Sequence, residues 1–272
     1  MWCFVLLALL YGAVEGITEW LPVSSTGHLI LLRHFLPFAL DDAFFELFEV
    51  AVQCGAILAV PLLFFRELFP FFGGSSREER RAGLCLWGKI LLAVLPAAVV
   101  GILFDDTIDR VLFRVPVVAA ALIFYGIFFL FAEHGKKTPR VTQLSDLSTK
   151  DALGIGLFQV LALVPGTSRS GATVLGGILL GISRPIAASF SFFLGIPTML
   201  GAGFLKGLKL FSARGALAPA EWLMLGVGML TAFLVSLTVI RFLMDFVKRH
   251  TFAAFGVYRI LLGVLLLLIL LF

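Results

Sequence analysis

The chain has 272 residues, of which 60% are hydrophobic and 14% are charged. Soluble domains contain roughly 45–50% apolar and roughly 25% charged residues, so this composition excludes an ordinary soluble protein and predicts a polytopic membrane protein. Long unbroken apolar runs favour helices over a membrane β-barrel, whose strands alternate over about ten residues. The net charge of +4 gives no argument for nucleic-acid binding. The three cysteines have no metal or disulfide spacing and are expected to be packing residues.

The chain opens with two short apolar runs, residues 2–14 and 29–36, which flank the polar stretch from Glu15 to His28. Neither run reaches the roughly 20 residues that a spanning helix needs. The first run lacks a basic start and a small-residue cleavage site, so a signal peptide is not expected. We therefore expect residues 1–36 to form a re-entrant helical hairpin.

The remaining apolar segments divide the chain into two similar halves. Three spans are expected at 44–65, 84–104 and 115–132, followed by a polar linker at about 133–150. Two short pieces, 152–164 and 172–182, then flank a polar break at 165–171. Three more spans are expected at about 186–205, 221–243 and 253–272.

The two polar breaks align when Pro22 is matched to Pro165 and the residues that follow are paired in order. Each half, 1–132 and 151–272, then holds one hairpin and three spans. Because three is odd, the halves must have opposite topology. The predicted fold is an all-α membrane domain of two inverted repeats, whose hairpin tips meet inside the bilayer.

Basic residues are divided unevenly between the loops of the two sides. Eleven lie on one side: Arg66, Arg77, Arg80, Arg81, Lys136, Lys137, Arg140, Lys150, Arg241, Lys248 and Arg249. Five lie on the other side, beside an acidic turn expected at 105–109: Arg110, Arg114, Lys206, Lys209 and Arg214. The positive-inside rule makes the first side cytoplasmic, so the first hairpin and both chain ends face outward.

Glu15 and Glu19 are four residues apart and share one face of a helix. Such a pair repels unless a divalent cation, an arginine or a shared proton neutralises it. Mg²⁺ commonly binds one or two carboxylates together with substrate phosphate oxygens, and Ca²⁺ also prefers oxygen ligands. The alternative is a pair of glutamates in the headgroup zone. Glu49 and Gln53 have the same spacing, and either line the same cavity or bond across helices.

Ser24, Ser25, Thr26 and His28 precede an apolar run, where serine and threonine are N-cap residues. A helix N-terminus with free N–H groups is an anion site. His28 is a candidate general base or proton donor. The alternative is a capped half-helix with a histidine at the membrane interface.

The second break carries Thr167, Ser168, Arg169 and Ser170. A forked guanidinium suits phosphate, and an arginine between apolar stretches needs an anionic partner. That partner is either a substrate phosphate, which we favour, or one of the two glutamates. Together the two breaks predict hydrolysis of a phosphate ester or anhydride on a lipid.

At these residues the sequence resembles the undecaprenyl-diphosphate phosphatases of the bacitracin-resistance type. The resemblance covers essentially the whole chain and is carried by residues 15–28, by Phe48-Glu49-Val50 with Gln53, and by residues 165–171. Trp20 and Cys54 depart from the usual pattern without touching a polar group. The resemblance implies a bacterial inner-membrane enzyme that converts the C55 isoprenoid diphosphate to the monophosphate at the outer face. That reaction recycles the carrier for peptidoglycan synthesis. Divalent-metal dependence is also implied, as is resistance to bacitracin, which sequesters the substrate. Family structures contain interdigitated inverted repeats.

We expect Ser25 to be the nucleophile, activated by His28 and Glu19. Arg169 and the hydroxyl groups of both breaks would bind the diphosphate. A metal-bound water with Ser25 as a ligand is the competing mechanism. Transport is the alternative function, since inverted repeats with broken helices are a transporter architecture. In that case the protein would flip the carrier monophosphate across the membrane. The sequence leaves undecided whether the protein forms a homodimer.

Overall fold

A computed structural model describes residues 2–37, 42–72, 76–134, 138–214 and 216–270 of the chain. Within these residues the fold is all-helical, with one isolated parallel bridge between Val141 and Ile182 and no named strand. Several charges used for the predicted orientation lie outside the described parts: Lys136 and Lys137, and the side chains of Asp105, Asp106, Asp109 and Arg214.

Twelve α-helices and two 3-10 turns make up the described chain. Their bounds are α1 (Trp2–Thr18), α2 (Ser25–Phe35), α3 (Asp42–Ile57), α4 (Ala59–Leu63), α5 (Phe65–Leu68), α6 (Arg77–Leu112), α7 (Val115–Ala132), η1 (Leu144–Asp146), α8 (Thr149–Val160), η2 (Leu161–Leu163), α9 (Arg169–Leu179), α10 (Arg184–Arg214), α11 (Pro219–Arg249) and α12 (Ala253–Ile269).

Five helical segments of the described chain are long and apolar enough to cross a membrane. They are α3 with α4, the apolar part of α6, α7, most of α10, and α11, and they correspond to five of the six predicted spans. The sixth, expected at 253–272, is α12, an apolar helix of 17 residues. That length is at the lower limit of the roughly 17–25 residues that a span requires.

The acidic stretch at 105–109 is not the turn that the sequence analysis predicts. Helix α6 continues through it to Leu112, and the turn comes at Phe113 and Arg114. No glycine or proline interrupts residues 102–115, and Pro116 lies in the first turn of α7, where proline favours a helix start. At its other end α6 begins at Arg77, because Ser76 and Glu79 form a capping box.

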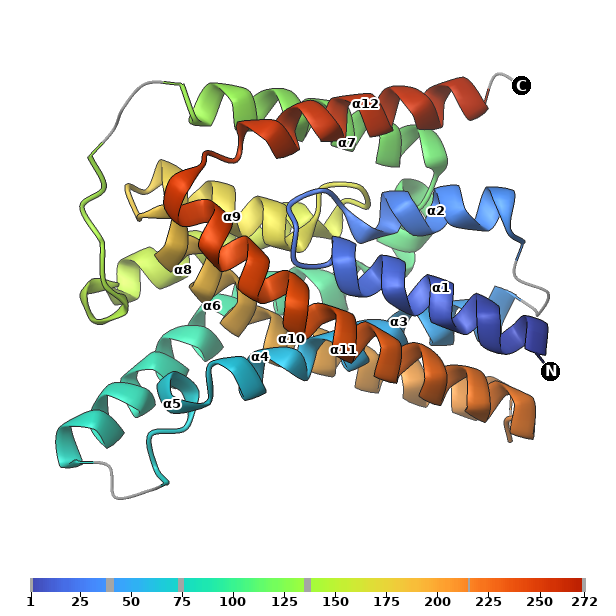
Figure 1. Cartoon of the computed structure of the whole chain (residues 1–272), viewed down its shortest axis with the longest axis horizontal. Coiled ribbons are helices and arrows are strands. Elements are labelled where there is room, and N and C mark those ends of the chain that lie inside the picture. The colour runs from blue at the N-terminus through green and yellow to red at the C-terminus, as the bar shows by residue number, and fades with distance from the viewer. Residues whose placement is uncertain (1, 38–41, 73–75, 135–137, 215, 271–272) are drawn as a thin grey trace.

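The most extensive helix contacts join helices from opposite halves. Helix α1 packs on α11, α6 on α8, α7 on α12, and α3 on both α10 and α11. Figure 1 places the start of α1 and the end of α12 at one end of the long axis, and the start of α8 and the α11–α12 junction at the other.

Glycines permit the closest of these contacts. A Cβ atom on Gly16 of α1 would lie 2.7 Å from the Ala232 carbonyl oxygen of α11. Between α7 and α12 the contact is reciprocal, since a Cβ on Gly126 or on Gly256 would lie 2.8 Å from the carbonyl oxygen of the other. Small residues allow backbones to approach in this way where the surrounding lipid removes most of the hydrophobic driving force.

The predicted linker is held against α9 in its described part, residues 138–148. Arg140 donates to the carbonyl oxygen of Leu180 and forms an ion pair with Asp151. Burial of the Asp151 carboxyl raises its pKa, but hydrogen bonds from Arg140 and Ser148 outweigh burial, so the pKa lies below its ordinary value. The linker therefore fixes the start of α8 instead of serving as a loose connection.

We expect Gly16→Ala to lower the free energy of unfolding by about 1–3 kcal/mol, because its new methyl group overlaps the α11 backbone. Thermal unfolding of the detergent-purified protein measures the effect. Gly226→Ala on α11 is the matched control, since a Cβ there meets no atom within 4 Å. Equal melting temperatures for the two variants would contradict the proposed close contact.

Candidate active site

The two polar breaks have the same backbone construction. Ser24 caps α2 and Ser168 caps α9, and their hydroxyl oxygens accept from the N–H groups of Gly27 and Gly171 at 3.4 and 3.1 Å. Their φ angles are 71° and 69°, the two positive values among the described non-glycine residues. Such conformations cost of order 1–3 kcal/mol each and persist only where the surrounding structure imposes them.

This shared geometry pairs Ser24 with Ser168, one position away from the sequence alignment, which pairs Ser25 with Ser168. Ser24 is the structural equivalent of Ser168, because both are N-caps with the same backbone conformation. Ser25 is therefore equivalent to Arg169, the first residue of the second half-helix. The prolines that guided the sequence alignment stand at different distances from the cap.

Arg259 of α12 holds the two breaks together. Its guanidinium group donates to the carbonyl oxygens of Pro22 at 3.0 Å, Gly166 at 3.0 Å and Thr167 at 2.8 Å. The side chain is fully buried, and the rings of Tyr125 and Phe129 lie about 6 Å from its central carbon. Among the described residues no carboxylate pairs with it, so its partners are the backbone dipoles of the breaks.

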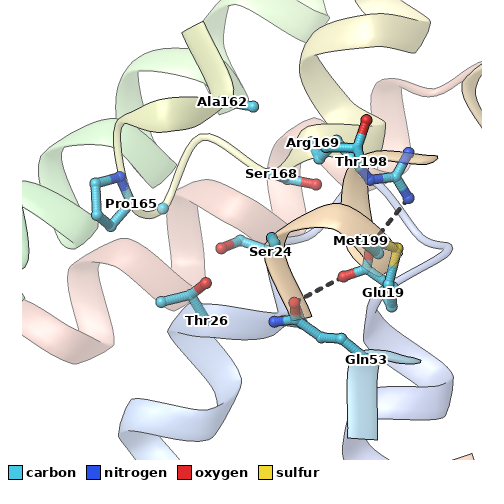
Figure 2. A pocket seen from close by; sticks show the side chains of 13 residues that line it. Glu19, Ser24, Thr26, Gln53, Ala162, Pro165, Ser168, Arg169, Thr198 and Met199 are labelled. Carbon is cyan, nitrogen blue, oxygen red and sulfur yellow. Dashed lines mark hydrogen bonds and ion pairs between the residues drawn. The ribbon is translucent and has the colours of Figure 1, made fainter. Parts of the chain in front are cut away.

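Glu19 is the hub of the side chains between the breaks. Its Oε1 accepts from Arg169 Nη2 at 2.9 Å and its Oε2 accepts from the Ser25 hydroxyl at 3.0 Å. Arg169 Nη1 also donates to the Ser191 carbonyl oxygen at 2.8 Å. Figure 2 shows the Arg169–Glu19 ion pair as a dashed line beside the cavity. Of the two alternative partners for Arg169, the structure contains the glutamate.

A cavity of about 190 Å³ lies beside this ion pair. Seven predicted site residues line it: Glu19, Ser24, Ser25, Thr26, Gln53, Ser168 and Arg169. Thr198, Met199 and Ala202 of α10 close another side. The first turns of α2 and α9 both border it, so two sets of free backbone N–H groups lie beside a cationic side chain. This environment suits an anion.

Five predicted residues do not line the cavity: Glu15, His28, Glu49, Thr167 and Ser170. Ser170 is buried, and its hydroxyl donates to the Glu19 carbonyl oxygen at 3.0 Å, which ties α9 to the first break. Thr167 contributes a carbonyl oxygen to Arg259. Glu49 is half-buried on α3, one turn before Gln53. These residues support the site from outside the cavity.

His28 is not bonded to Ser25, contrary to the predicted nucleophile–base pair. Its Nδ1 lies 2.7 Å from the Ser24 carbonyl oxygen, and its Nε2 lies 2.7 Å from the Tyr258 hydroxyl, whose ring it stacks on. Ser25 and His28 are three residues apart in α2, so their side chains are neighbours on one helix face. Both ring nitrogens of His28 are nevertheless occupied, by the Ser24 carbonyl oxygen and the Tyr258 hydroxyl. The group that accepts the Ser25 hydrogen bond is Glu19.

Glu15 is fully buried, and neither carboxylate oxygen has a hydrogen-bond partner. A buried polar group of this kind is costly unless a proton or a ligand satisfies it. Within the described residues no three side chains of histidine, cysteine, aspartate or glutamate are grouped to hold a metal ion by themselves. Two carboxylates remain a suitable donor set for a cation that takes its other ligands from phosphate and water.

Arg259, Tyr258 and Thr198 are not among the site residues predicted from the sequence. The signal for Arg259 was present, because it is the single charge within the apolar run from Phe252 to Leu270. Charges inside a membrane helix are rare and mark functional positions. Tyr258 and Thr198 carry no comparable signal, since only their place in the fold gives them a role.

Comparisons with known proteins agree over nearly the whole chain. A family model described as "Bacitracin resistance protein BacA" matches residues 8–265. "Undecaprenyl-diphosphatase 1" of Clostridioides difficile is 51% identical over 260 residues, covering 96% of this chain and 94% of that protein. "Undecaprenyl-diphosphatase" of Streptococcus mutans is 52% identical over 266 residues, with coverages of 97% and 95%. The Enterococcus faecalis protein of the same name is 48% identical over 261 residues, 95% of each chain.

We expect Arg259→Met to lower the free energy of unfolding by roughly 3–5 kcal/mol, because it leaves three buried carbonyl oxygens without a charged donor. Thermal unfolding in detergent measures the loss. Arg241→Met, at an exposed position on α11, is the control and should melt close to the wild type. A similar melting temperature for the two variants would show that Arg259 does not hold the breaks together.

Proposed function

Because the chain belongs to the BacA bacitracin resistance family, we propose that it hydrolyses undecaprenyl diphosphate to undecaprenyl phosphate and inorganic phosphate. This reaction recycles the lipid carrier for cell-wall synthesis and confers bacitracin resistance. The observation that carries the proposal is the convergence of Ser25, Glu19 and Arg169 at one cavity between two helix N-termini. A nucleophile, a base and a phosphate-binding cation are thereby within reach of one anionic group.

In the proposed mechanism Ser25 Oγ attacks the terminal phosphorus and its proton passes to Glu19 Oε2, which already accepts its hydrogen bond. The anhydride P–O bond breaks, and undecaprenyl phosphate leaves with the proton that Glu19 took from Ser25. Glu19, again ionised, then takes a proton from the water that attacks the phosphoserine and returns it to Ser25 Oγ as inorganic phosphate is released.

Arg169 and the N–H groups at the starts of α2 and α9 would bind the phosphoryl oxygens and stabilise the charge that develops on them. Arg169 meets Glu19 through one nitrogen and the Ser191 backbone through another, so both ends of its fork are held before the substrate arrives. His28, between the Ser24 carbonyl and Tyr258, positions the first turn of α2.

We also propose a divalent cation, Mg²⁺ or Ca²⁺, held by Glu19 and Glu15 together with substrate oxygens. The two unpartnered oxygens of Glu15 support this assignment, as does the position of Glu19 on the cavity. When bound, the cation neutralises part of the diphosphate charge. Glu15 does not line the cavity. It lies on α1, one helical turn before Glu19, and would bind the cation from that position.

For the membrane arrangement we propose two inverted repeats, with α1–α2 and α8–α9 as re-entrant hairpins. The packing pairs support it, because exchanging the halves converts α1–α11 contact into α8–α6 contact and leaves α7–α12 and α3–α10 unchanged. The uneven loop charges support a site that opens to the outer face of the bacterial cytoplasmic membrane.

A second candidate function is flipping of the lipid monophosphate, which the same exchange of halves favours, since transporters share this architecture. Phosphate release from the detergent-solubilised protein separates the two functions. Hydrolysis proceeds without a sealed bilayer, whereas flipping has no meaning there.

We expect Ser25→Ala, Glu19→Gln and Arg169→Ala each to lower the rate of phosphate release from undecaprenyl diphosphate at least 100-fold. Brief reaction with labelled substrate should leave a phosphoserine at Ser25, found by mass spectrometry. Ser145→Ala, in the exposed linker, is the control. Substantial turnover by Ser25→Ala would exclude it as the nucleophile.

Chelation by EDTA should lower the rate roughly 100-fold, and added Mg²⁺ or Ca²⁺ should restore it. Glu15→Gln should raise the cation concentration needed for half-maximal rate, because it removes a charged ligand. Glu78→Gln, which alters an exposed acid in the first turn of α6, is the matched control and should leave that concentration unchanged. A rate that does not respond to chelator would exclude the cation.

A further inference from the structure

A second hollow, which the mechanism does not use, lies between α6 and α8. Its volume is about 630 Å³, and all nine lining residues are apolar: Leu92, Leu95, Pro96, Val99, Val100, Leu153, Leu157, Val160 and Leu161. We call this set the α6–α8 groove. Volumes of about 300–1,000 Å³ are usual for sites that enclose an organic ligand.

The groove lies beside a close backbone contact between the two helices. A Cβ atom on Gly156 would lie 2.2 Å from the Ala93 carbonyl oxygen, so the backbones of α8 and α6 meet there directly. Beside this contact, Leu95 and Leu157 remain 55% and 58% exposed. The result is a concave apolar surface beside the Gly156–Ala93 backbone contact.

The groove adjoins the catalytic cavity. The two are separated by η2, where Leu161 lines the groove and the next residue, Ala162, lines the cavity. Leu163 completes the turn and lies against α6, because a Cβ on Gly101 would be 3.5 Å from its side chain. One end of the groove therefore lies beside the cavity, across η2.

We propose that the α6–α8 groove binds the isoprene units of the substrate that are nearest the diphosphate; this rests on the proposed phosphatase function. The chemistry matches, because an isoprenoid has no hydrogen-bonding group and the lining offers none. A diphosphate would find no donor there. The groove thus gives the substrate a second point of attachment beside Arg169.

Binding here differs from ordinary contact with membrane lipid. Lipid tails are as apolar as leucine, so the groove gains little from the hydrophobic effect and instead gains from close packing against fixed side chains. The functional gain is uniform binding, since the tail makes the same contacts before and during the reaction at the phosphorus. Loss of the groove should therefore raise KM for the isoprenoid diphosphate.

The first test fills the groove. We expect Leu95→Trp to raise KM for undecaprenyl diphosphate about tenfold in a phosphate-release assay and to leave kcat within about twofold, because the phosphate contacts stay intact. Leu234→Trp on α11 is the matched control. Leu234 is 54% exposed and lines neither the groove nor the cavity, so its variant should keep the wild-type KM.

The second test uses the wild-type enzyme, so it does not depend on whether a variant folds. An isoprenoid diphosphate with a diazirine on its second or third isoprene unit is bound to the wild-type enzyme and irradiated, and the adducts are mapped by mass spectrometry. We expect adducts within residues 92–100 and 153–161. Excess undecaprenyl diphosphate should suppress them, whereas ordinary phospholipid should not.

The outcomes separate this proposal from the proposed function. Adducts confined to other helices, or equal KM values for Leu95→Trp and Leu234→Trp, would overturn the groove while hydrolysis by the wild type still stands. Adducts that phospholipid suppresses equally would mean general lipid contact and would also overturn it. If the wild type releases no phosphate from any isoprenoid diphosphate, the phosphatase function itself fails.

Discussion

The buried guanidinium group of Arg259 is the interaction on which the site depends. Three carbonyl oxygens, from two breaks that lie in opposite halves of the chain, accept its hydrogen bonds. A charged side chain at this depth costs at least about 2.5–3.5 kcal/mol on insertion scales, so it requires strong partners. The carbonyl oxygens of the two breaks lie outside the helices and need donors equally, because a buried backbone polar group without a partner is costly. The guanidinium group and the carbonyl oxygens therefore satisfy each other's hydrogen-bonding needs, and this interaction fixes the two breaks next to each other.

Once the breaks are joined, the side chains that they carry have fixed positions relative to one another. Ser24 and Ser168 are held at positive φ, which aims the first turns of α2 and α9 at one cavity. Glu19 then meets Arg169 across the junction, and Ser25 completes the contact. The ion pair is nearly neutral as a whole, so the cavity can be buried without substrate. It still presents a cation and a base to an incoming diphosphate.

The same arrangement explains why the site has two kinds of wall. The hydrogen-bonding groups come from the first turns of the half-helices, where backbone N–H groups have no partner within the helix. The apolar surface of the α6–α8 groove comes from the crossing of an apolar helix with a hairpin arm at Gly156. A lipid diphosphate combines a strongly anionic head with an entirely apolar tail, and the short turn η2 is the boundary between the two environments.

The sequence determined the all-helical class of the fold, five of the spans, and most of the residues that line the cavity. These features follow from local physics: apolar length, capping serines, and charges that are too costly to bury without purpose. Only the tertiary structure decided that Glu19 rather than His28 accepts the Ser25 hydrogen bond. It also gave Ser24 and Ser168 the same cap conformation and made Arg259 the link between the two breaks. These choices depend on where helices distant in sequence meet, and periodicity along one chain gives the face of a helix on which a side chain lies but not the partner that it meets there.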